Sequence, residues 1–260
     1  NLWAWFVNKT IQAISFFLMN IALKRAKNIV WNSKSYFEAS YFKKYIDKFV
    51  WIYPPIDFKK IWAWTEATEI PENNDIYKIW FLWRIVYEKW INFLLEALLD
   101  ERLKDKNFHL YLGWDYKWVR WGSVMWELSW LIEQTKDKIT FLWNLNTTQL
   151  KDFFSKLDVL VLPSIDPLES FWMVQVESMF NNTPVIASNM PWVNEVVNKT
   201  GFGYLTTPKS SSDLAIQIEK MIQEKEKYRE LRQNNTIKET VLKDFATEKT
   251  VWEYIKVFNI

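Results

Sequence analysis

The sequence contains no cysteine, one histidine and only four glycines among its 260 residues. The lack of cysteine excludes disulfides, thiol nucleophiles and thiolate-bound metals, and the single His109 excludes a metal centre built from several imidazoles. Basic and acidic residues nearly balance, 33 against 31, so the net charge of +2 gives no reason to expect a nucleic-acid partner. Long apolar runs are also missing: residues 11–23, the longest, include Gln12, Ser15 and Asn20 and are too few to span a bilayer.

Tryptophan is abundant where glycine is scarce. The chain has 18 tryptophans, whereas average usage would give a chain of this length about 18 glycines. Trp83, Trp143 and Trp172 each follow an apolar run or precede a helical pattern, where a tight turn favours glycine. We interpret this as a gene that uses UGA for glycine and was translated with UGA read as tryptophan. The alternative is a true Trp-rich protein with an aromatic carbohydrate-binding surface, and Trp252, inside a helical pattern, is expected to be genuine.

Strands and helices alternate along most of the chain. Strands are expected at 28–32, 49–53, 77–82, 108–112, 138–142, 158–162, 184–187 and near Tyr204. Helices are expected at 9–27, 34–46, 88–103, 123–135, 147–155, 171–180, 191–197, 211–233 and 245–257. This alternation predicts an α/β fold with a doubly wound parallel sheet, which binds ligands at the carboxyl ends of its strands.

Two glutamates frame the strongest group of candidate site residues. A helix that begins near Phe171 places Glu169 on the loop before it and Glu177 about two turns inside it. The free amides at such a helix start suit a phosphate or a sugar, and the carboxylates can accept hydrogen bonds from sugar hydroxyls. The alternative for this pair alone is two solvated glutamates on a surface helix.

Several motifs in order resemble one enzyme family. The segments 158–164, 169–172, 177–179 and 183–188 resemble the donor-binding half of the retaining GT-B glycosyltransferases of family four (glycosyl transferases group 1), with Trp172 where that family has glycine. Further similar segments are Trp83-Arg84, Glu88-Lys89-Trp90, Leu112-Gly113-Trp114-Asp115, Phe141-Leu142-Trp143-Asn144, Pro191-Trp192-Val193-Asn194-Glu195, Gly201-Phe202-Gly203-Tyr204-Leu205 and Val50-Trp51-Ile52-Tyr53-Pro54-Pro55-Ile56-Asp57. The resemblance covers roughly residues 28–220 and implies a GT-B fold with a Rossmann-like C-terminal domain.

The resemblance also implies a role for each matching residue. Arg84 and Lys89 would neutralise the donor diphosphate as it leaves, which is electrostatic stabilisation of the developing charge. Glu169 would contact the transferred sugar, Glu177 would hold the ribose, and Asn144 would lie beside the base. No cofactor and no obligatory metal are implied.

Residues 171–174 are the place where the printed sequence departs most from the family. The amides of Phe171, Trp172, Met173 and Val174 would line the sugar and phosphate site. An indole at Trp172 would fill donor space, so we expect the literal sequence to bind a sugar nucleotide poorly. The family's acceptor-side Gly-rich loop and catalytic-site histidine have no counterpart here, and His109 is expected to be a hydrogen-bonded structural histidine.

These observations predict four regions and one activity. Residues 1–58 are expected to be a remnant of the acceptor-side domain, 59–75 a linker, 76–240 the donor-binding domain, and 241–260 a helix that crosses back. The expected function is transfer of a sugar, of the hexosyl type, from a nucleotide-diphosphate sugar to a glycan, lipid or protein acceptor with retention of configuration, the chain being an inactive fragment as written. The alternatives are a sugar-nucleotide epimerase of the same fold and a non-catalytic carbohydrate-binding protein. A cytoplasmic location is expected, with peripheral contact at the inner membrane face left open.

Overall fold

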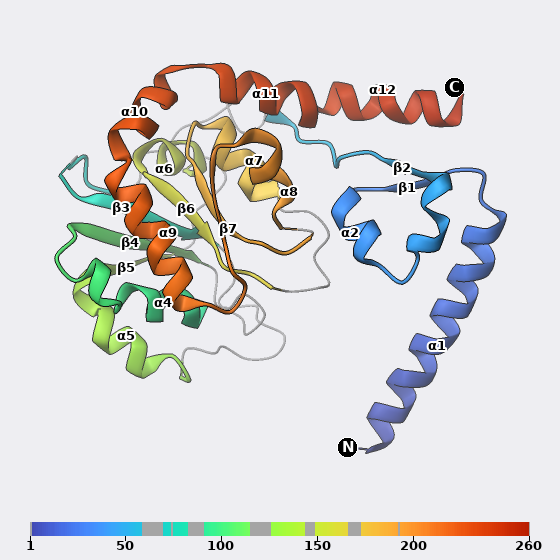
Figure 1. Cartoon of the computed structure of the whole chain (residues 1–260), viewed down its shortest axis with the longest axis horizontal. Helices are drawn as coiled ribbons and strands as arrows, with labels where there is room; N and C mark the ends of the chain where they lie inside the picture. The colour runs from blue at the N-terminus through green and yellow to red at the C-terminus, as the bar shows by residue number, and fades with distance from the viewer. Residues whose placement is uncertain are drawn as a thin grey trace.

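Two units follow one another in the chain. The structure is a computed structural model that describes residues 2–58, 70–73, 75–82, 91–114, 126–143, 149–165, 173–191 and 193–259. Residues 2–58 form a small N-terminal unit, and most of the remainder forms a larger sheet domain (Figure 1). The last helix runs from the sheet domain across to the N-terminal unit (Figure 1).

A six-stranded parallel sheet is the centre of the sheet domain. Its strands are β3 (Tyr77–Leu82), β4 (Phe108–Trp114), β5 (Ile139–Trp143), β6 (Val159–Leu162), β7 (Val185–Ser188) and β8 (Gly203–Thr206). Their spatial order is β5-β4-β3-β6-β7-β8, and every neighbouring pair is parallel. The chain therefore starts in the middle, winds outward on one side and returns to wind outward on the other, which confirms the predicted doubly wound fold.

Helices cover both faces of this sheet (Figure 1). They are α4 (Ile91–Leu98), η3 (Glu101–Leu103), α5 (Ser129–Thr135), η4 (Lys136–Lys138), α6 (Leu150–Lys156), α7 (Met173–Phe180), α8 (Glu195–Thr200), α9 (Ser211–Gln223), α10 (Lys225–Gln233), α11 (Thr236–Phe245) and α12 (Thr247–Phe258), where η denotes a 3-10 helix.

Two predicted helices are interrupted, and one helix forms where none was predicted. The helix expected over 211–233 breaks at Glu224, whose carboxylate accepts a hydrogen bond of 2.7 Å from the Tyr204 hydroxyl of β8. Residues 236–245, where no helix was expected, form α11, and the Asn234 side chain accepts a hydrogen bond of 3.1 Å from the Thr236 amide just before it. The helix expected over 34–46 ends at Ala39 and continues as the 3-10 helix η1.

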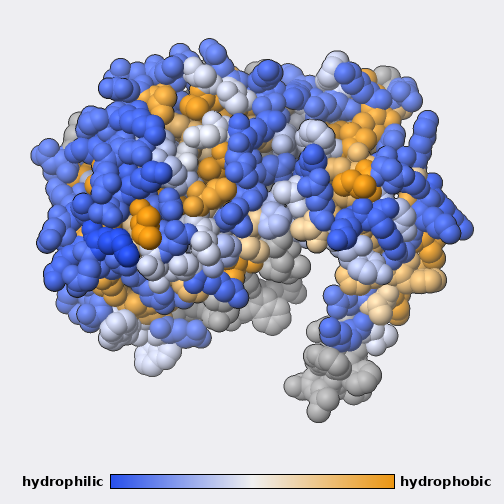
Figure 2. Space-filling view, viewed as in Figure 1, coloured by the Kyte–Doolittle hydropathy of each residue, from blue (hydrophilic) through white to orange (hydrophobic). Residues whose placement is uncertain are grey.

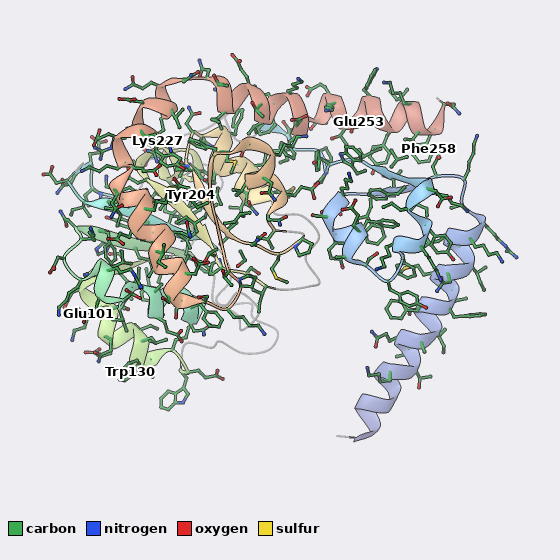
Figure 3. All side chains as sticks on the ribbon, in the orientation of Figure 1. Glu101, Trp130, Tyr204, Lys227, Glu253 and Phe258 are labelled. Atoms are coloured by element: carbon green, nitrogen blue, oxygen red, sulfur yellow. The ribbon has the colours of Figure 1, made fainter. Side chains whose placement is uncertain are left out.

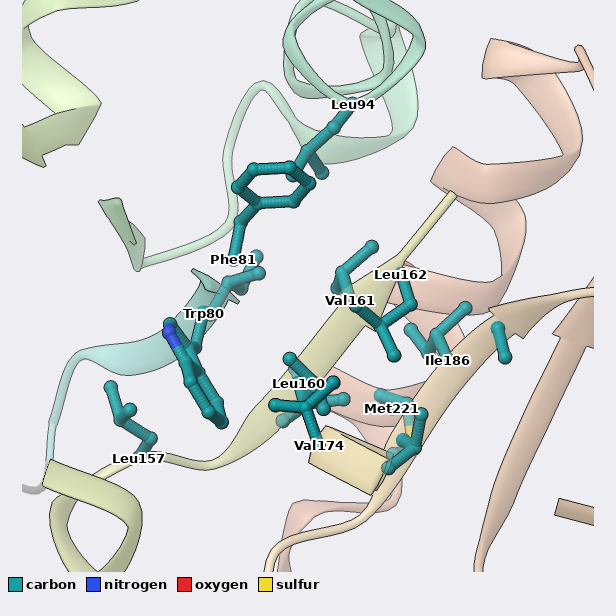
Figure 4. Close-up of a cluster of buried hydrophobic side chains, with 14 of the residues drawn as sticks. Trp80, Phe81, Leu94, Leu157, Leu160, Val161, Leu162, Val174, Ile186 and Met221 are labelled. Carbon is teal, nitrogen blue, oxygen red and sulfur yellow. The ribbon is translucent and has the colours of Figure 1, made fainter. Parts of the chain in front are cut away.

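The hydrophobic core lies between the sheet and its helices (Figure 4). All four residues of β6 are buried, as expected for a strand covered on both faces. Trp80 of β3 is fully buried and packs edge-on against Phe153 and Phe154, with ring centroids 4.7 and 4.5 Å away. Its indole N–H makes no hydrogen bond to any residue that the structure describes.

The edge strand β8 depends on one glycine. Gly203 has φ +143°, and a Cβ atom built there would lie 1.9 Å from the carbonyl oxygen of Val185 on β7. No side chain fits at that distance, so the close approach of β8 to β7 requires glycine at this position.

The N-terminal unit has its own small core. It contains α1 (Leu2–Arg25), β1 (Ile29–Trp31), α2 (Lys34–Ala39), η1 (Lys43–Lys48) and β2 (Phe49–Trp51). β1 and β2 form a two-stranded parallel sheet, and Phe37 stacks on Phe49 with centroids 4.3 Å apart. α1 projects from this unit, and the apolar face expected for it is exposed, with Phe17 65% and Leu18 59% accessible (Figure 2). Within the described ranges, no helix combines the length and the apolar character needed to cross a membrane.

The described tryptophans occupy regular structure as well as turns. Trp31 and Trp51 end β1 and β2, and Trp130 projects into solvent from α5 (Figure 3). Trp114 and Trp143 are the last residues of β4 and β5 and pair with one another. None of the tryptophans in the described ranges has a positive φ, so their backbone conformations do not by themselves require glycine. The UGA interpretation therefore stays a prediction.

Candidate functional site

The candidate site lies at the carboxyl edge of the six-stranded sheet. The chain leaves β3 toward one side and β6 toward the other, so the two central strands diverge at this edge. Doubly wound sheets bind ligands in the crevice that this divergence creates. Pro163, Ser164 and Ile165 follow β6 and are buried, which fixes the backbone where the chain turns toward α7.

Helix α7 supplies the described part of the predicted phosphate-binding turn. Its first residue, Met173, is 47% exposed, whereas the next residue, Val174, is buried in the core. The side chain of Val174 therefore anchors the helix, and only its backbone can face a ligand. Val176, Met179 and Phe180 are buried further along, so the packed helix holds its amino end in place.

Glu177 is a partly buried carboxylate with no partner among the residues that the structure describes. Its side chain makes no hydrogen bond or ion pair to the residues that the structure describes. Burial raises the pKa of the Glu177 carboxyl above its ordinary value, because a charged group loses its hydration there. A buried charge is costly unless a partner compensates it, so Glu177, with no partner among the described residues, is the candidate on α7 for a ligand contact.

Gln175, which sequence reasoning did not select, connects α7 to the next loop. Its side chain is fully buried, and its Nε2 donates a hydrogen bond of 2.8 Å to the carbonyl oxygen of Val193. Its Oε1 has no hydrogen-bond partner among the described residues. The only sequence signal was a polar residue within an otherwise apolar helix face, between Val174 and Val176.

Only part of the predicted site lies in the described ranges. Met173, Val174 and Glu177 share α7 at the carboxyl edge of the sheet. The other predicted site residues, Arg84, Lys89, Asn144, Glu169, Phe171 and Trp172, lie outside the described residues.

A second, polar cleft of about 540 Å³ lies at the opposite, amino edge of the sheet. Lys78 and Asp158 meet there at the starts of β3 and β6, and the Lys78 amide donates to Asp158 Oδ2 at 2.8 Å. Arg232 donates to the Leu157 carbonyl at the end of α6, where a cation complements the helix dipole. The basic side chains of this cleft thus lie beside carboxylates and a helix end, and we interpret the cleft as a structural network of charged groups.

No metal centre is found in the part of the chain that the structure covers with described residues: no three His, Cys, Asp or Glu side chains there gather around a common point. His109 has the structural role expected from the sequence. Its Nε2 lies 2.8 Å from Thr140 Oγ1 on the neighbouring strand, and burial lowers the pKa of its imidazole.

Comparisons with known proteins agree with this geometry. The family model described as "Glycosyl transferases group 1" matches residues 63–238, more than half of the chain. An uncharacterized glycosyltransferase of Methanocaldococcus jannaschii is 26% identical over 212 residues, which cover 79% of this chain and 52% of that protein. The O-antigen chain mannosyltransferase RfbU of Salmonella typhimurium is 45% identical over 64 residues, 25% of this chain and 18% of that protein.

Solved structures show the same fold. The crystal structure of HepE from Anabaena in complex with UDP has a TM-score of 0.74 at 20% identity, covering 92% of this chain and 65% of that one. Sucrose-phosphate synthase from Thermosynechococcus elongatus has a TM-score of 0.73 at 20% identity, covering 94% and 60%. This chain spans about half the length of the first of these curated relatives. By its sequence match and its fold, the chain belongs to the glycosyl transferases group 1 family.

Proposed function

We propose that the carboxyl edge of the six-stranded sheet binds a nucleotide-diphosphate sugar, and that the whole protein transfers the sugar to an acceptor with retention of configuration. The observation that carries the proposal is Glu177, a partly buried carboxylate on α7 without a partner among the described residues. A ribose diol offers two hydroxyl donors side by side, which match the two oxygens of one carboxylate. Binding would thus supply hydrogen bonds that Glu177 does not make to the described residues.

The remaining roles follow from the family to which the chain belongs. Arg84 and Lys89 are proposed to stabilise the departing diphosphate, and Glu169 to contact the transferred sugar. Asn144 is proposed to lie beside the base, and the amides of residues 171–174 to line the sugar and phosphates. None of these roles calls for a metal ion.

A uridine nucleotide is the first donor to test, because the structurally similar HepE was solved with UDP and with UDP-glucose. The acceptor is left as a glycan, a lipid or a protein. A location at the inner membrane face is a further part of the proposal that the acceptor would decide.

Isothermal calorimetry with UDP tests the donor site. We expect the purified chain to bind UDP weakly and the Trp172→Gly variant to bind it more tightly, because an indole would occupy donor space in the loop. Glu177→Gln should weaken binding about tenfold or more, since one charge-assisted hydrogen bond contributes about 1.5–3 kcal/mol.

Glu239→Gln is the matched control, because Glu239 is an exposed glutamate on α11, away from the carboxyl edge. Equal UDP affinity of Glu177→Gln and the parent chain would refute the ribose role. Release of nucleotide from a UDP-sugar only when an acceptor is present would favour the transferase over an epimerase.

One observation favours a second candidate function, binding of carbohydrate by aromatic stacking. Trp126 and Trp130 are 86% and 65% exposed; Trp130 lies in the first turn of α5 and Trp126 in the turn just before the helix. Exposed indoles of this kind can stack on sugar rings. Glycan binding without nucleotide that is lost in Trp130→Ala would support this candidate, whereas no glycan binding would remove it.

A further inference from the structure

Glu195 joins the sheet domain to the N-terminal unit. It is the first residue of α8, and its carboxylate accepts hydrogen bonds from four groups of the N-terminal unit. The donors are the Ser33 hydroxyl, the Ser35 hydroxyl (3.1 Å), the Tyr53 hydroxyl (2.9 Å) and the Lys34 amide (3.4 Å). A charge-assisted cluster of this kind is far stronger than a single exposed contact.

The groups on the N-terminal side are themselves fixed. Ser33 is fully buried, and its oxygen accepts from the Tyr36 amide, so the residue that caps α2 also donates to Glu195. Tyr53 lies where the chain leaves the N-terminal unit, and its ring packs against Phe245. Burial and the neighbouring Glu195 charge raise the pKa of Tyr53, so its hydroxyl stays a donor at any physiological pH.

The sheet-domain side of the contact leads to the candidate site. Glu195 follows a turn formed by residues 189–191 and 193–194, in which the Val193 and Asn194 amides both donate to the Met190 carbonyl at 2.9 Å. The Val193 carbonyl of this turn receives the buried Gln175 side chain from α7. Hydrogen bonds at both ends of the short backbone segment 193–195 therefore connect α7 to α2 of the N-terminal unit.

We propose that Gln175 and Glu195 are positioning residues that couple the orientation of the N-terminal unit to helix α7. The turn is held to α7 by Gln175 and to the N-terminal unit by Glu195, so movement at one end is transmitted to the other. The catalytic consequence rests on the proposed function, since only then does α7 carry the donor. The mechanical coupling does not depend on it.

Other hydrogen bonds between described residues across this boundary use backbone acceptors and do not reach α7. Thr250 Oγ1 donates to the Tyr53 carbonyl at 3.0 Å, and the Ile56 amide donates to the Phe245 carbonyl at 3.3 Å. Asn28 Nδ2 donates to the Val257 carbonyl at the end of α12 at 3.4 Å. Among these hydrogen bonds, those of Glu195 connect the start of α2 to the turn that α7 holds.

Hydrogen–deuterium exchange of the 260-residue chain tests the coupling. Glu195→Ala should speed exchange of the Lys34 and Tyr36 amides by roughly tenfold or more, the factor expected when a charge-assisted hydrogen bond is lost. Gln175→Leu should speed exchange at Val193 and Asn194, and also at Lys34. The rise at Lys34 should be absent when Gln175→Leu is added to Glu195→Ala, because the path is already broken.

Glu239→Ala is the control, since Glu239 occupies the first turn of α11 as Glu195 does that of α8. Unchanged exchange at Lys34 in Glu195→Ala, or an equal rise in Glu239→Ala, would overturn the proposal, as would additive effects in the double variant. If Glu195→Ala does not fold, Ser35→Ala removes one of the four bonds and should give a smaller rise at Lys34, and no rise would overturn the proposal.

UDP calorimetry on the same variants separates this inference from the proposed function. Weaker UDP binding in Glu195→Ala, with unchanged binding in Glu239→Ala, would extend the coupling to the donor. If the parent and Trp172→Gly chains both fail to bind UDP while the exchange pattern is as expected, the proposed function fails and the coupling stands.

Discussion

Glu177 gives the sharpest test of the reasoning about the site, because stability and binding should change in opposite directions. Its carboxylate is partly buried, has no described protein partner and has a pKa raised by the loss of hydration. Replacing it by glutamine keeps the shape and removes the charge. We therefore expect Glu177→Gln to stabilise the unliganded protein at neutral pH while it weakens UDP binding.

The magnitude follows from the cost of an unpaired buried group. Such a group costs about 1–3 kcal/mol, and a neutral amide at the same place retains part of that cost. A gain of about 1–2 kcal/mol at pH 7 is expected, which corresponds to a rise in Tm of about 3–6 °C for a chain of this size.

The pH dependence of the gain identifies its cause. A carboxyl whose pKa is raised in the folded state favours folding at low pH, and this contribution is lost as the pH rises through the folded-state pKa. Parent and Glu177→Gln should therefore melt at the same temperature below pH 4.5, the ordinary glutamate value, and separate as the pH approaches 7.

Thermal melts of both proteins at pH 4 and pH 7 measure this difference, with Glu239→Gln expected to change stability by less than about 0.5 kcal/mol. A lower Tm for Glu177→Gln at pH 7, or a gain of equal size at both pH values, would refute the reasoning. Saturating UDP should then raise the Tm of the parent more than that of the variant.

Three further predictions concern the core, a hydrogen bond at the start of α9 and the genetic code. Trp80→Ala should lower the free energy of unfolding by about 3–5 kcal/mol in a denaturant titration, because it leaves a cavity beside Phe153, whereas a loss below about 1 kcal/mol would contradict the observed packing. Asp213→Ala should cost about 1 kcal/mol at pH 7, because the Asp213 carboxylate accepts from the Thr207 amide at 2.5 Å before α9. Burial raises the pKa of Asp213, but the hydrogen bonds from Thr207 outweigh burial, so the net effect is a lowered pKa. The loss of stability in Asp213→Ala should therefore be complete above pH 3.8 and become smaller as the pH falls below it. A loss of the same size at pH 2 would contradict this account. Mass spectrometry of the native peptide 139–151 should find glycine at position 143 if UGA encodes glycine, and tryptophan there would make the aromatic residues genuine.

The sheet was predictable from the sequence because its signals are local. Runs such as residues 159–162 are short, apolar and β-branched, and their alternation with helical patterns specifies a parallel sheet. The break at Glu224 was not predictable, since it accompanies a hydrogen bond from Tyr204, twenty residues away on β8. Helical periodicity continues through that position and carries no sign of the contact.

Some residues of the candidate site could be predicted from the sequence, whereas its long-range contacts could not. Glu177 could be named from the sequence because it lies in a run of motifs that resemble the family, whereas its spacing from Glu169 alone also suits two solvated glutamates. The contacts of Gln175 with Val193 and of Glu195 with Ser33 join residues 18 and 162 positions apart, and only the folded chain brings them together. In the sequence, Gln175 and Glu195 look like ordinary polar residues, and nothing marks their partners.

The close approach of β8 to β7 at Gly203 has a consequence for the genetics of this protein. A side chain of any size would strike the Val185 carbonyl, so an indole at residue 203 would force the last strand off the sheet. A UGA codon at this position would leave folding unchanged in a cell that decodes UGA as glycine, and would prevent the last strand from pairing in a cell that decodes UGA as tryptophan. Codon 203 can therefore serve as a reporter: a version of the gene carrying UGA there should yield folded protein only where the codon means glycine.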